Sequence, residues 1–366
     1  MDTTQVQADE ESDLIEDLPI PEELKDAIIF ESGYVCDYQS DLPSTFSLSG
    51  CSREIDVSVF SRVKNLTLRS CEGVTDVSPL SGAYFLNLSG CKRVTDVSAL
   101  GTVTVLILAC TGIVDVSALG TVKRLVLSKC KAVVDVSALG SVKELNLSGC
   151  TGVTDVSALG GVEDLDLSGC TGVVDVSALG GVTRLKLVDC TEVKDFSALG
   201  DVEELDLSGC TQLTDVSFVR STKKLFLCDC TGVVDVSPLS KLEQLFLSNC
   251  TGVVDVSALG EIEHLDLQSC TGVTDVSSLG GGGVAQLNLE GCTGAVDVSA
   301  LGKVTCLYLN DCTRVVDVSS LGTVFELDLT GCTGVTDVSA LGEVKILNLT
   351  RCKGIRDFSA VPRAIH

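Results

Sequence analysis

The chain is built from a unit of 20 residues that recurs from about Pro43 to the C-terminus. One copy, residues 162–181, reads VEDLDLSGCTGVVDVSALGG. A cysteine marks each of 16 copies at a spacing of 20, except for 19 before Cys110 and 22 before Cys292. An Asp follows every marker by five residues, and a Ser follows that Asp by two. A fixed period of this length indicates a repeat protein in which each copy is one structural unit.

Apolar residues recur at seven positions of this unit. The Leu-x-Leu pair has the period of a strand whose two leucines face one side. One copy cannot enclose seven apolar side chains, whereas stacked copies bury them in a continuous core. The strands of successive copies are then expected to lie parallel, about 4.8 Å apart. The seven positions in the copy above are Val162, Leu165, Leu167, Cys170, Val173, Val176 and Leu179.

The pattern LxxLxLxxCxxVxDVSxL resembles the leucine-rich repeat in its cysteine-containing variety. GCTGVTDVSALG is similar to the repeat arrays of kinetoplastid protists and some giant viruses, and LSGCTGVTD resembles repeats of F-box ubiquitin-ligase adaptors. The resemblance covers about residues 43–361. It implies an α/β repeat protein, mostly β: a leucine-rich-repeat solenoid of about 16 repeats with a parallel concave sheet. A 20-residue unit has no room for a full helix, so short 3₁₀ or turn segments are expected on the convex side.

Three segments are expected along the chain. Residues 1–17 are acidic and polar, which is typical of a disordered tail. Residues 18–42 are expected to form an N-terminal helical cap, with a helix over residues 19–30 that buries Leu18, Leu24, Ala27 and Ile28. The alternative is a degenerate F-box, because LPIPEEL resembles the opening of that domain, although the chain has no Trp. Residues 43–366 form the repeat array. No capping helix is evident at its end, and an open strand edge there predicts a weak homodimer.

Composition limits the partners and the compartment. The net charge is −25, of which residues 1–42 contribute −12, with 13 acidic residues and one basic residue. Such a chain is a poor nucleic-acid ligand, because phosphate binding needs clustered Lys and Arg. The N-terminus lacks a signal peptide, and no apolar run is long enough to cross a membrane. The 19 cysteines are therefore expected to be free thiols in a reducing, cytoplasmic protein.

Two columns of identical residues suggest sites but are more simply structural. The marker cysteines lack the close pairs of metal sites and are expected to pack as small apolar groups that donate weakly to a neighbouring turn. Cys228 and Cys306 lie off this column and are the better candidates for reactive thiols. Each Asp of Asp-Val-Ser is expected to accept backbone N–H groups in an Asx turn or helix N-cap. The alternative is calcium binding, but each unit supplies only one carboxylate.

The sequence offers no catalytic or cofactor-binding constellation. The chain has two histidines, His264 and His366, so a His-based triad lacks material. The Gly-Gly and Ser-Gly pairs are turn residues, and no GxxxxGK[ST] motif occurs. We therefore expect a protein that is not an enzyme and that binds no metal or cofactor.

The residues that vary most are those expected to point away from the core, on the concave strand face. Phe226 and Phe246 are equivalent residues of consecutive copies, with Lys224 and Gln244 beside them. Adjacent exposed aromatic residues are typical of binding hot spots, although drift after duplication would place them equally well. The chain is thus predicted to be a protein–protein interaction scaffold, with an F-box-like substrate adaptor as the alternative. The predicted partner-binding residues are Phe226, Phe246, Lys224, Gln244, His264, Asp266, Tyr308, Arg184 and Lys186.

Overall fold

A computed structural model describes residues 44–52 and 55–365 of the chain. The chain divides into two compact units, Met1–Glu163 and Asp164–His366. The tail, the helical cap and the F-box alternative predicted for residues 1–42 lie outside the described residues. The described residues belong to the repeat array.

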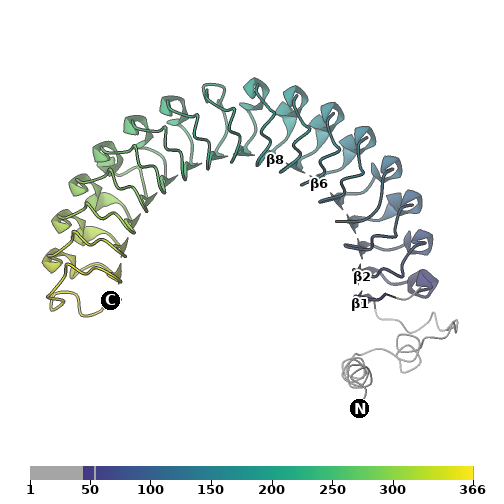
Figure 1. The fold of residues 1–366 in the computed structure, drawn as a ribbon, viewed down its shortest axis with the longest axis horizontal. Coiled ribbons are helices and arrows are strands. Elements are labelled where there is room, and N and C mark those ends of the chain that lie inside the picture. The colour runs from purple at the N-terminus through teal and green to yellow at the C-terminus, as the bar shows by residue number, and fades with distance from the viewer. Residues whose placement is uncertain (1–43, 53–54, 366) are drawn as a thin grey trace, which may run out of the picture. The chain divides into compact units, whose positions relative to one another are not determined.

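The described part of the first unit holds six strands and six 3₁₀ helices that alternate along the chain (Figure 1). Each strand pairs in parallel with the next one in the sequence. The strands are β1 (Thr45–Ser49), β2 (Asn65–Arg69), β3 (Phe85–Asn87), β4 (Val105–Ile107), β5 (Arg124–Val126) and β6 (Glu144–Asn146). The 3₁₀ helices are η1 (Val57–Phe60), η2 (Ser78–Leu80), η3 (Ser98–Thr102), η4 (Ser117–Leu119), η5 (Ser137–Ser141) and η6 (Ser157–Gly161).

The second unit repeats the arrangement with ten parallel strands and eight 3₁₀ helices. The strands are β7 (Asp164–Asp166), β8 (Arg184–Lys186), β9 (Glu204–Asp206), β10 (Lys224–Phe226), β11 (Gln244–Phe246), β12 (His264–Asp266), β13 (Gln286–Asn288), β14 (Cys306–Tyr308), β15 (Glu326–Asp328) and β16 (Ile346–Asn348). The 3₁₀ helices are η7 (Ser177–Gly181), η8 (Ser197–Leu199), η9 (Ser237–Leu239), η10 (Ser257–Leu259), η11 (Ser277–Gly281), η12 (Ser299–Lys303), η13 (Ser319–Thr323) and η14 (Ser339–Leu341).

The predicted architecture is confirmed in both units. Equivalent residues stand side by side on neighbouring strands, as Leu225 does with Leu245. Within each unit the strands line the inner side of the coils and the 3₁₀ helices line the outer side (Figure 1). There is no α-helix within residues 44–52 and 55–365. The short unit therefore returns to the next strand through a single 3₁₀ turn, as its length predicts.

The seven apolar positions of the repeat form the core. In the copy at residues 162–181 all seven side chains are at most 1% exposed. Because each coil contributes the same side chains at the same heights, the leucines, valines and thiols of successive coils stack into columns within each unit. This stacking is what stabilises a repeat that has no core of its own. The side of the sheet opposite the buried leucines is called the strand face below.

One predicted marker cysteine is misplaced. Thr111 occupies the marker position of the 19-residue copy, where it is half-buried, and its hydroxyl donates to the Leu108 carbonyl at 2.7 Å. Cys110 is exposed and lies one residue earlier, in the left-handed conformation (φ 60°). This copy is one residue short, and the deletion lies after the marker position rather than before it. The marker position is therefore residue 111, and the nearby cysteine at 110 is not its equivalent.

The coil that contains β9 departs from the repeat on its outer side. No 3₁₀ helix forms between β9 and β10, where Phe218 and Arg220 replace the usual Ala and Gly. The Phe218 ring stacks on Phe196 of the preceding coil, with centroids 6.3 Å apart. Arg220 and Ser221 both bind the Asp201 carboxylate, at 3.1 and 2.6 Å. The coil keeps its place through side-chain contacts instead of the 3₁₀ turn.

The last strand is not left fully open at its edge. The Ile365 amide donates to the Leu347 carbonyl at 2.9 Å, and the Leu349 amide donates to the Ile365 carbonyl at 2.6 Å. Ile365 thereby forms a parallel bridge with Asn348 of β16. The sequence analysis expected a fully open edge without a capping helix; the Ile365 bridge covers part of that edge. The weak homodimer stays a prediction.

Candidate functional site

The aspartate column is a set of Asx turns. In all 16 copies the Asp Oδ1 accepts the backbone N–H of the Ser two residues later, at 2.8 or 2.9 Å. These hydrogen bonds hold the pKa of Asp255 below its usual value, while Asp235 and Asp275 on the neighbouring coils oppose the shift. The structural interpretation of this column is therefore supported: the carboxylate starts a turn, which in 14 of the 16 copies leads into a 3₁₀ helix.

We expect Asp255→Ala to lower the melting temperature by roughly 2–4 °C, because the turn loses its acceptor. Asp255→Asn is the matched control: it keeps an acceptor oxygen and removes the repulsion from Asp235 and Asp275, so it is expected to be close to neutral. Since the folded-state pKa is lowered, this stabilisation is present above the unfolded pKa and is lost as the pH falls through the folded value. Millimolar calcium should leave the melting temperature unchanged; a rise of many degrees specific to calcium contradicts the structural role.

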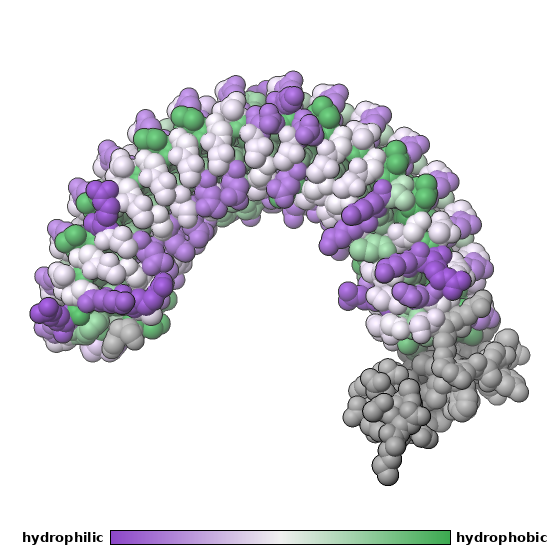
Figure 2. All heavy atoms as spheres, viewed as in Figure 1, coloured by the Kyte–Doolittle hydropathy of each residue, from purple (hydrophilic) through white to green (hydrophobic). Residues whose placement is uncertain are grey.

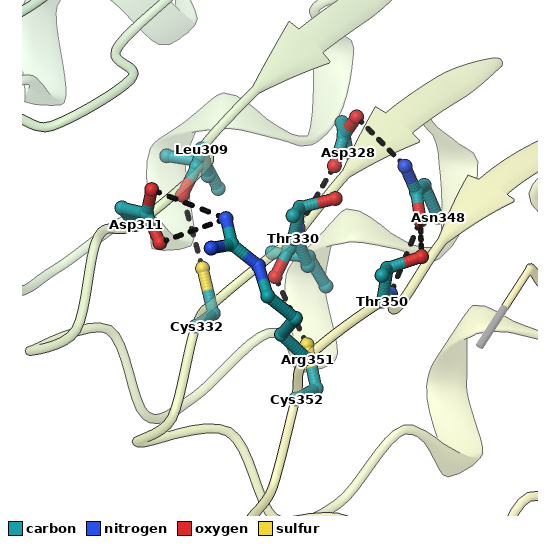
Figure 3. Close-up of polar contacts among 10 residues, drawn as sticks. Leu309, Asp311, Asp328, Thr330, Cys332, Asn348, Thr350, Arg351 and Cys352 are labelled. Carbon is teal, nitrogen blue, oxygen red and sulfur yellow. Dashed lines mark hydrogen bonds and ion pairs between the residues drawn. The ribbon is translucent and has the colours of Figure 1, made fainter.

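The cysteine column terminates the strands of the preceding coils. Thirteen marker thiols donate to the carbonyl of the second leucine of the previous copy, at distances from 2.8 Å for Cys91 to 3.8 Å for Cys71. Figure 3 shows two consecutive examples, with Cys332 bonded to Leu309 and Cys352 one coil further. Burial raises the pKa of Cys270 to about 12. These thiols stay protonated and act as donors.

We expect all 19 cysteines to react with an alkylating reagent after denaturation without reductant, because the 18 described ones are free. In the native protein we expect fast reaction at the exposed Cys110 and at the half-buried Cys51, Cys228 and Cys306. The buried marker thiols should react only as fast as the array unfolds. Peptide mapping by mass spectrometry measures both. Protected pairs in the denatured, unreduced sample would contradict the free-thiol assignment.

On the strand face, one residue of each copy lies between the two leucines of the Leu-x-Leu pair. These 16 residues form a variable column, which divides into two groups. Eight of its 16 residues are Asn or Asp whose side-chain oxygen accepts the backbone N–H two residues later and so ends the strand in a second Asx turn: Asn87, Asn146, Asp166, Asp206, Asp266, Asn288, Asp328 and Asn348. In Figure 3, Asp328 and Asn348 make this turn to Thr330 and Thr350. These residues are explained by the fold. The other eight, which include Phe226 and Phe246, have no carbonyl or carboxylate for this turn.

Phe226 and Phe246 form a stacked pair on β10 and β11. Their ring centroids are 4.4 Å apart with an interplanar angle of 12°. The Lys224 ammonium lies 5.0 Å from the Phe226 centroid and 5.8 Å from the Phe246 centroid, within cation–π range. Both rings are half-buried, because each covers one face of the other. The predicted cluster is therefore brought together, with less apolar surface exposed than two separate rings would have.

Carboxylates flank the aromatic pair on both sides. Asp206 is the register partner of Phe226 on β9, and Asp266 is that of Phe246 on β12. Gln244 and His264 are also partners in register, beside the rings. The His264 Nε2 lies 3.5 Å from a Glu263 carboxylate oxygen. The centre of this surface is thus apolar, with one cation over it and polar groups around it.

The remaining predicted site residues lie on the same face but further along it. Arg184 binds the Asp164 carboxylate at 2.9 Å, and Lys186 is exposed between Asp166 and Asp206 in register. The Tyr308 hydroxyl donates to Glu326 at 3.0 Å. Burial, followed by this carboxylate, raises the pKa of Tyr308 to about 12. Arg184 and Tyr308 are thus engaged within the fold.

The strand face of the first unit carries apolar residues that the sequence analysis did not single out as a site. Phe85 pairs with Val105, and Ile107 pairs with Val126, on β3, β4 and β5. All four are half-buried and point away from the core. Each strand has two outward-facing positions, one on either side of its first leucine, and most residues at these positions are polar. Comparing both positions over three consecutive copies would have revealed the four apolar residues.

The outer side of the coils exposes a column of β-branched residues directly before the Asp column. Figure 2 shows apolar residues alternating with hydrophilic ones along the outer edge of each unit. Because a carboxylate stands beside each exposed valine, the column does not form a continuous apolar surface. The exposed valines are Val114, Val134, Val174, Val234, Val254, Val296 and Val316, at 43–61%.

The described ranges offer little for other kinds of site. No group of three or more His, Cys, Asp or Glu in them is arranged to hold a metal ion. A shallow pocket of about 290 Å³ lies between two outer turns and is lined by residues such as Val114, Asp115 and Ser137. Its lining residues are all residues of the repeated outer turns, from the exposed valine to the alanine after the Ser. No helix in the part of the chain that the structure describes is long and apolar enough to cross a membrane.

Comparison with solved structures identifies the fold. An internalin from Listeria monocytogenes strain 4b F2365 matches with a TM-score of 0.50 and 18% identity, covering 82% of this chain and 86% of that one. A leucine-rich-repeat protein from Leptospira interrogans matches with a TM-score of 0.49 and 14% identity, covering 85% and 92%. The functional domain of InlJ from Listeria monocytogenes, described as including a cysteine ladder, matches with a TM-score of 0.41 and 21% identity, covering 82% and 62%. No family model and no curated protein matches the sequence. The described residues thus have a leucine-rich-repeat fold.

Proposed function

We propose that this chain is a non-enzymatic scaffold that binds a protein partner on the strand face of its second unit. The observation that carries the proposal is the stacked pair Phe226 and Phe246, with Lys224 over the rings. Half of the residues in the same column are required by the strand-end turn, and a phenylalanine makes no such turn. The coils of Phe226 and Phe246 therefore lack the side-chain acceptor of the strand-end turn, and the two rings add nothing to the buried core.

The composition of this surface suits a polypeptide. An apolar side chain of the partner would pack on the exposed edges of the two rings, which is where burial contributes most. Asp206 and Asp266, in register on either side, would accept hydrogen bonds from its backbone or from a basic side chain. A small apolar centre with a polar rim is the usual anatomy of a protein interface.

The cellular setting is proposed from the thiols. Thirteen marker cysteines serve as hydrogen-bond donors inside the coils. Oxidation would remove those donors, so a reducing compartment such as the cytoplasm suits the protein. The likeness to kinetoplastid and giant-virus arrays rests on the repeat motif alone and adds no partner.

Capture of partners by the native full-length chain tests the proposal. We expect at least one protein to be retained by the wild-type chain and lost with Phe226→Ala/Phe246→Ala. Recovery of ubiquitin-ligase core subunits would favour the adaptor alternative, which no observation on the described residues favours at present. Equal retention by the two baits would place binding elsewhere and overturn the proposed surface.

A further inference from the structure

The first unit has an apolar patch on its strand face. The patch consists of Phe85, Val105, Ile107 and Val126. Phe85 and Val105 are register partners, as are Ile107 and Val126, and Val105 and Ile107 are two residues apart on β4. The four side chains are therefore contiguous across three strands. None of them contributes to the buried core, which the leucines between them already fill.

Away from the outer Asx turns, the first unit is basic, unlike the whole chain. Residues 44–163 contain 11 basic and 10 acidic residues. Six of those acids are the Asp of the outer Asx turns, so the rest of the unit has 11 basic against 4 acidic residues, a net charge of +7. Arg69, Lys123, Arg124 and Lys129 are exposed on the coils of β2 and β5. Glu144 is the only acidic residue in β1 to β6, and it is ion-paired with Arg124.

A segment of the same chain has the complementary composition. Residues 1–43 contain 13 acidic residues and one basic residue. Within them, residues 19–30 are predicted to form an amphipathic helix, with Leu24, Ala27 and Ile28 on its apolar side and Glu22, Glu23 and Asp26 in the same stretch. An acidic helix with one apolar stripe matches an apolar patch surrounded by basic side chains.

We propose that residues 19–30 dock on the apolar patch of β3 to β5 as an internal ligand of the first unit. The linker is long enough: β3 lies two strand spacings, about 10 Å, from β1. The 13 residues that connect position 30 to position 44 span about 40 Å when extended. Tethering raises the local concentration of the segment to the millimolar range, so a modest affinity suffices.

This placement differs from a cap over the first coil. That coil is already filled by Phe46 and Phe60, whose rings stack with centroids 4.9 Å apart and are 5% and 3% exposed. Both replace the leucine of other copies with a larger side chain. The larger rings fill more of the first coil than leucines would, which reduces the apolar surface that a cap would have to cover.

A tryptophan reporter in the full-length chain tests the docking, because the natural chain has no tryptophan. Phe85→Trp places the reporter in the patch. Adding Leu24→Ser/Ile28→Ser should remove the apolar stripe, shift the emission to longer wavelength and raise acrylamide quenching several-fold. The matched pair Glu22→Ser/Lys25→Ser leaves the net charge unchanged and should leave the emission unchanged. The unfolding transition of each variant shows that the array is intact.

Three outcomes would overturn the proposal. The first is an emission from Phe85→Trp that Leu24→Ser/Ile28→Ser leaves unchanged. The second is a response seen at a Phe46→Trp reporter and not at Phe85→Trp, which would place the segment on the first coil. The third is a response that depends on protein concentration, which would make the contact one between two chains. None of these bears on Phe226 and Phe246, so the proposed function stands or falls separately.

Discussion

Replacing Phe226 and Phe246 together by alanine should weaken partner binding by about 2 kcal/mol or more, roughly 30-fold in affinity, which is the hot-spot scale. The two rings stack at 4.4 Å and form the apolar centre of the surface. Their loss removes that centre and leaves Lys224 without its cation–π partners. Isothermal titration with the captured partner measures the change.

The control for this variant must not disturb a turn. Asn146 lies in the same column but holds the Ser148 amide at 2.9 Å, so replacing it would change the strand end. Thr67→Ala on β2 is the better control, because it occupies the same column in the first unit and is half-buried to a similar degree. It should leave affinity unchanged. Equal loss with both variants, or no loss with the double variant, would contradict a hot spot at the phenylalanine pair.

The second large effect is expected on stability, at a residue next to the pair. Leu245 is 0% exposed between the leucines of β10 and β12. Leu245→Ala should reduce the free energy of unfolding by about 2–5 kcal/mol, through lost transfer free energy and the cavity left behind. Phe246→Ala, one residue along the same strand, should cost less than about 1 kcal/mol because its ring is outside the core.

Urea denaturation followed by circular dichroism compares the two variants. The contrast tests the register of the strand, since a shift by one residue exchanges the buried and the exposed faces. If Phe246→Ala proves more destabilising than Leu245→Ala, the assigned face is wrong. Similar small losses for both would mean that this coil unfolds independently of its neighbours.

The core and the topology could be predicted from the sequence because stacked copies can bury the apolar positions of this repeat in only one way. Leu165 and Leu167 fix a strand and its buried side, and identical copies fix parallel neighbours in register. The Asp-Val-Ser turn was predictable for the same reason, since the interaction is local. Short-range geometry repeated many times is the part of a fold that sequence reasoning reaches most reliably.

The features that the sequence analysis missed arise where a single copy departs from the repeat pattern or where side-chain geometry decides the contact. Cys110 was taken for a core residue because the position of a one-residue deletion within a copy is not marked by the nearest cysteine. Counting five residues from Leu106 would have selected Thr111 instead. The second Asx column was also detectable, since Asn87-Leu-Ser and Asn146-Leu-Ser place an acceptor two residues before the amide that it binds. The stacking of Phe226 on Phe246 needed side-chain geometry that no pattern contains.

Site-specific photo-crosslinking from the native chain tests most directly whether the strand face of the second unit binds the partner. A photoreactive amino acid at Gln244, on β11 beside the ring pair, should crosslink to the captured protein. The same group at Val254, 56% exposed on the outer side of the same coil, should not. Crosslinking is expected at position 244 only. Crosslinking at position 254 without any at position 244 would contradict it.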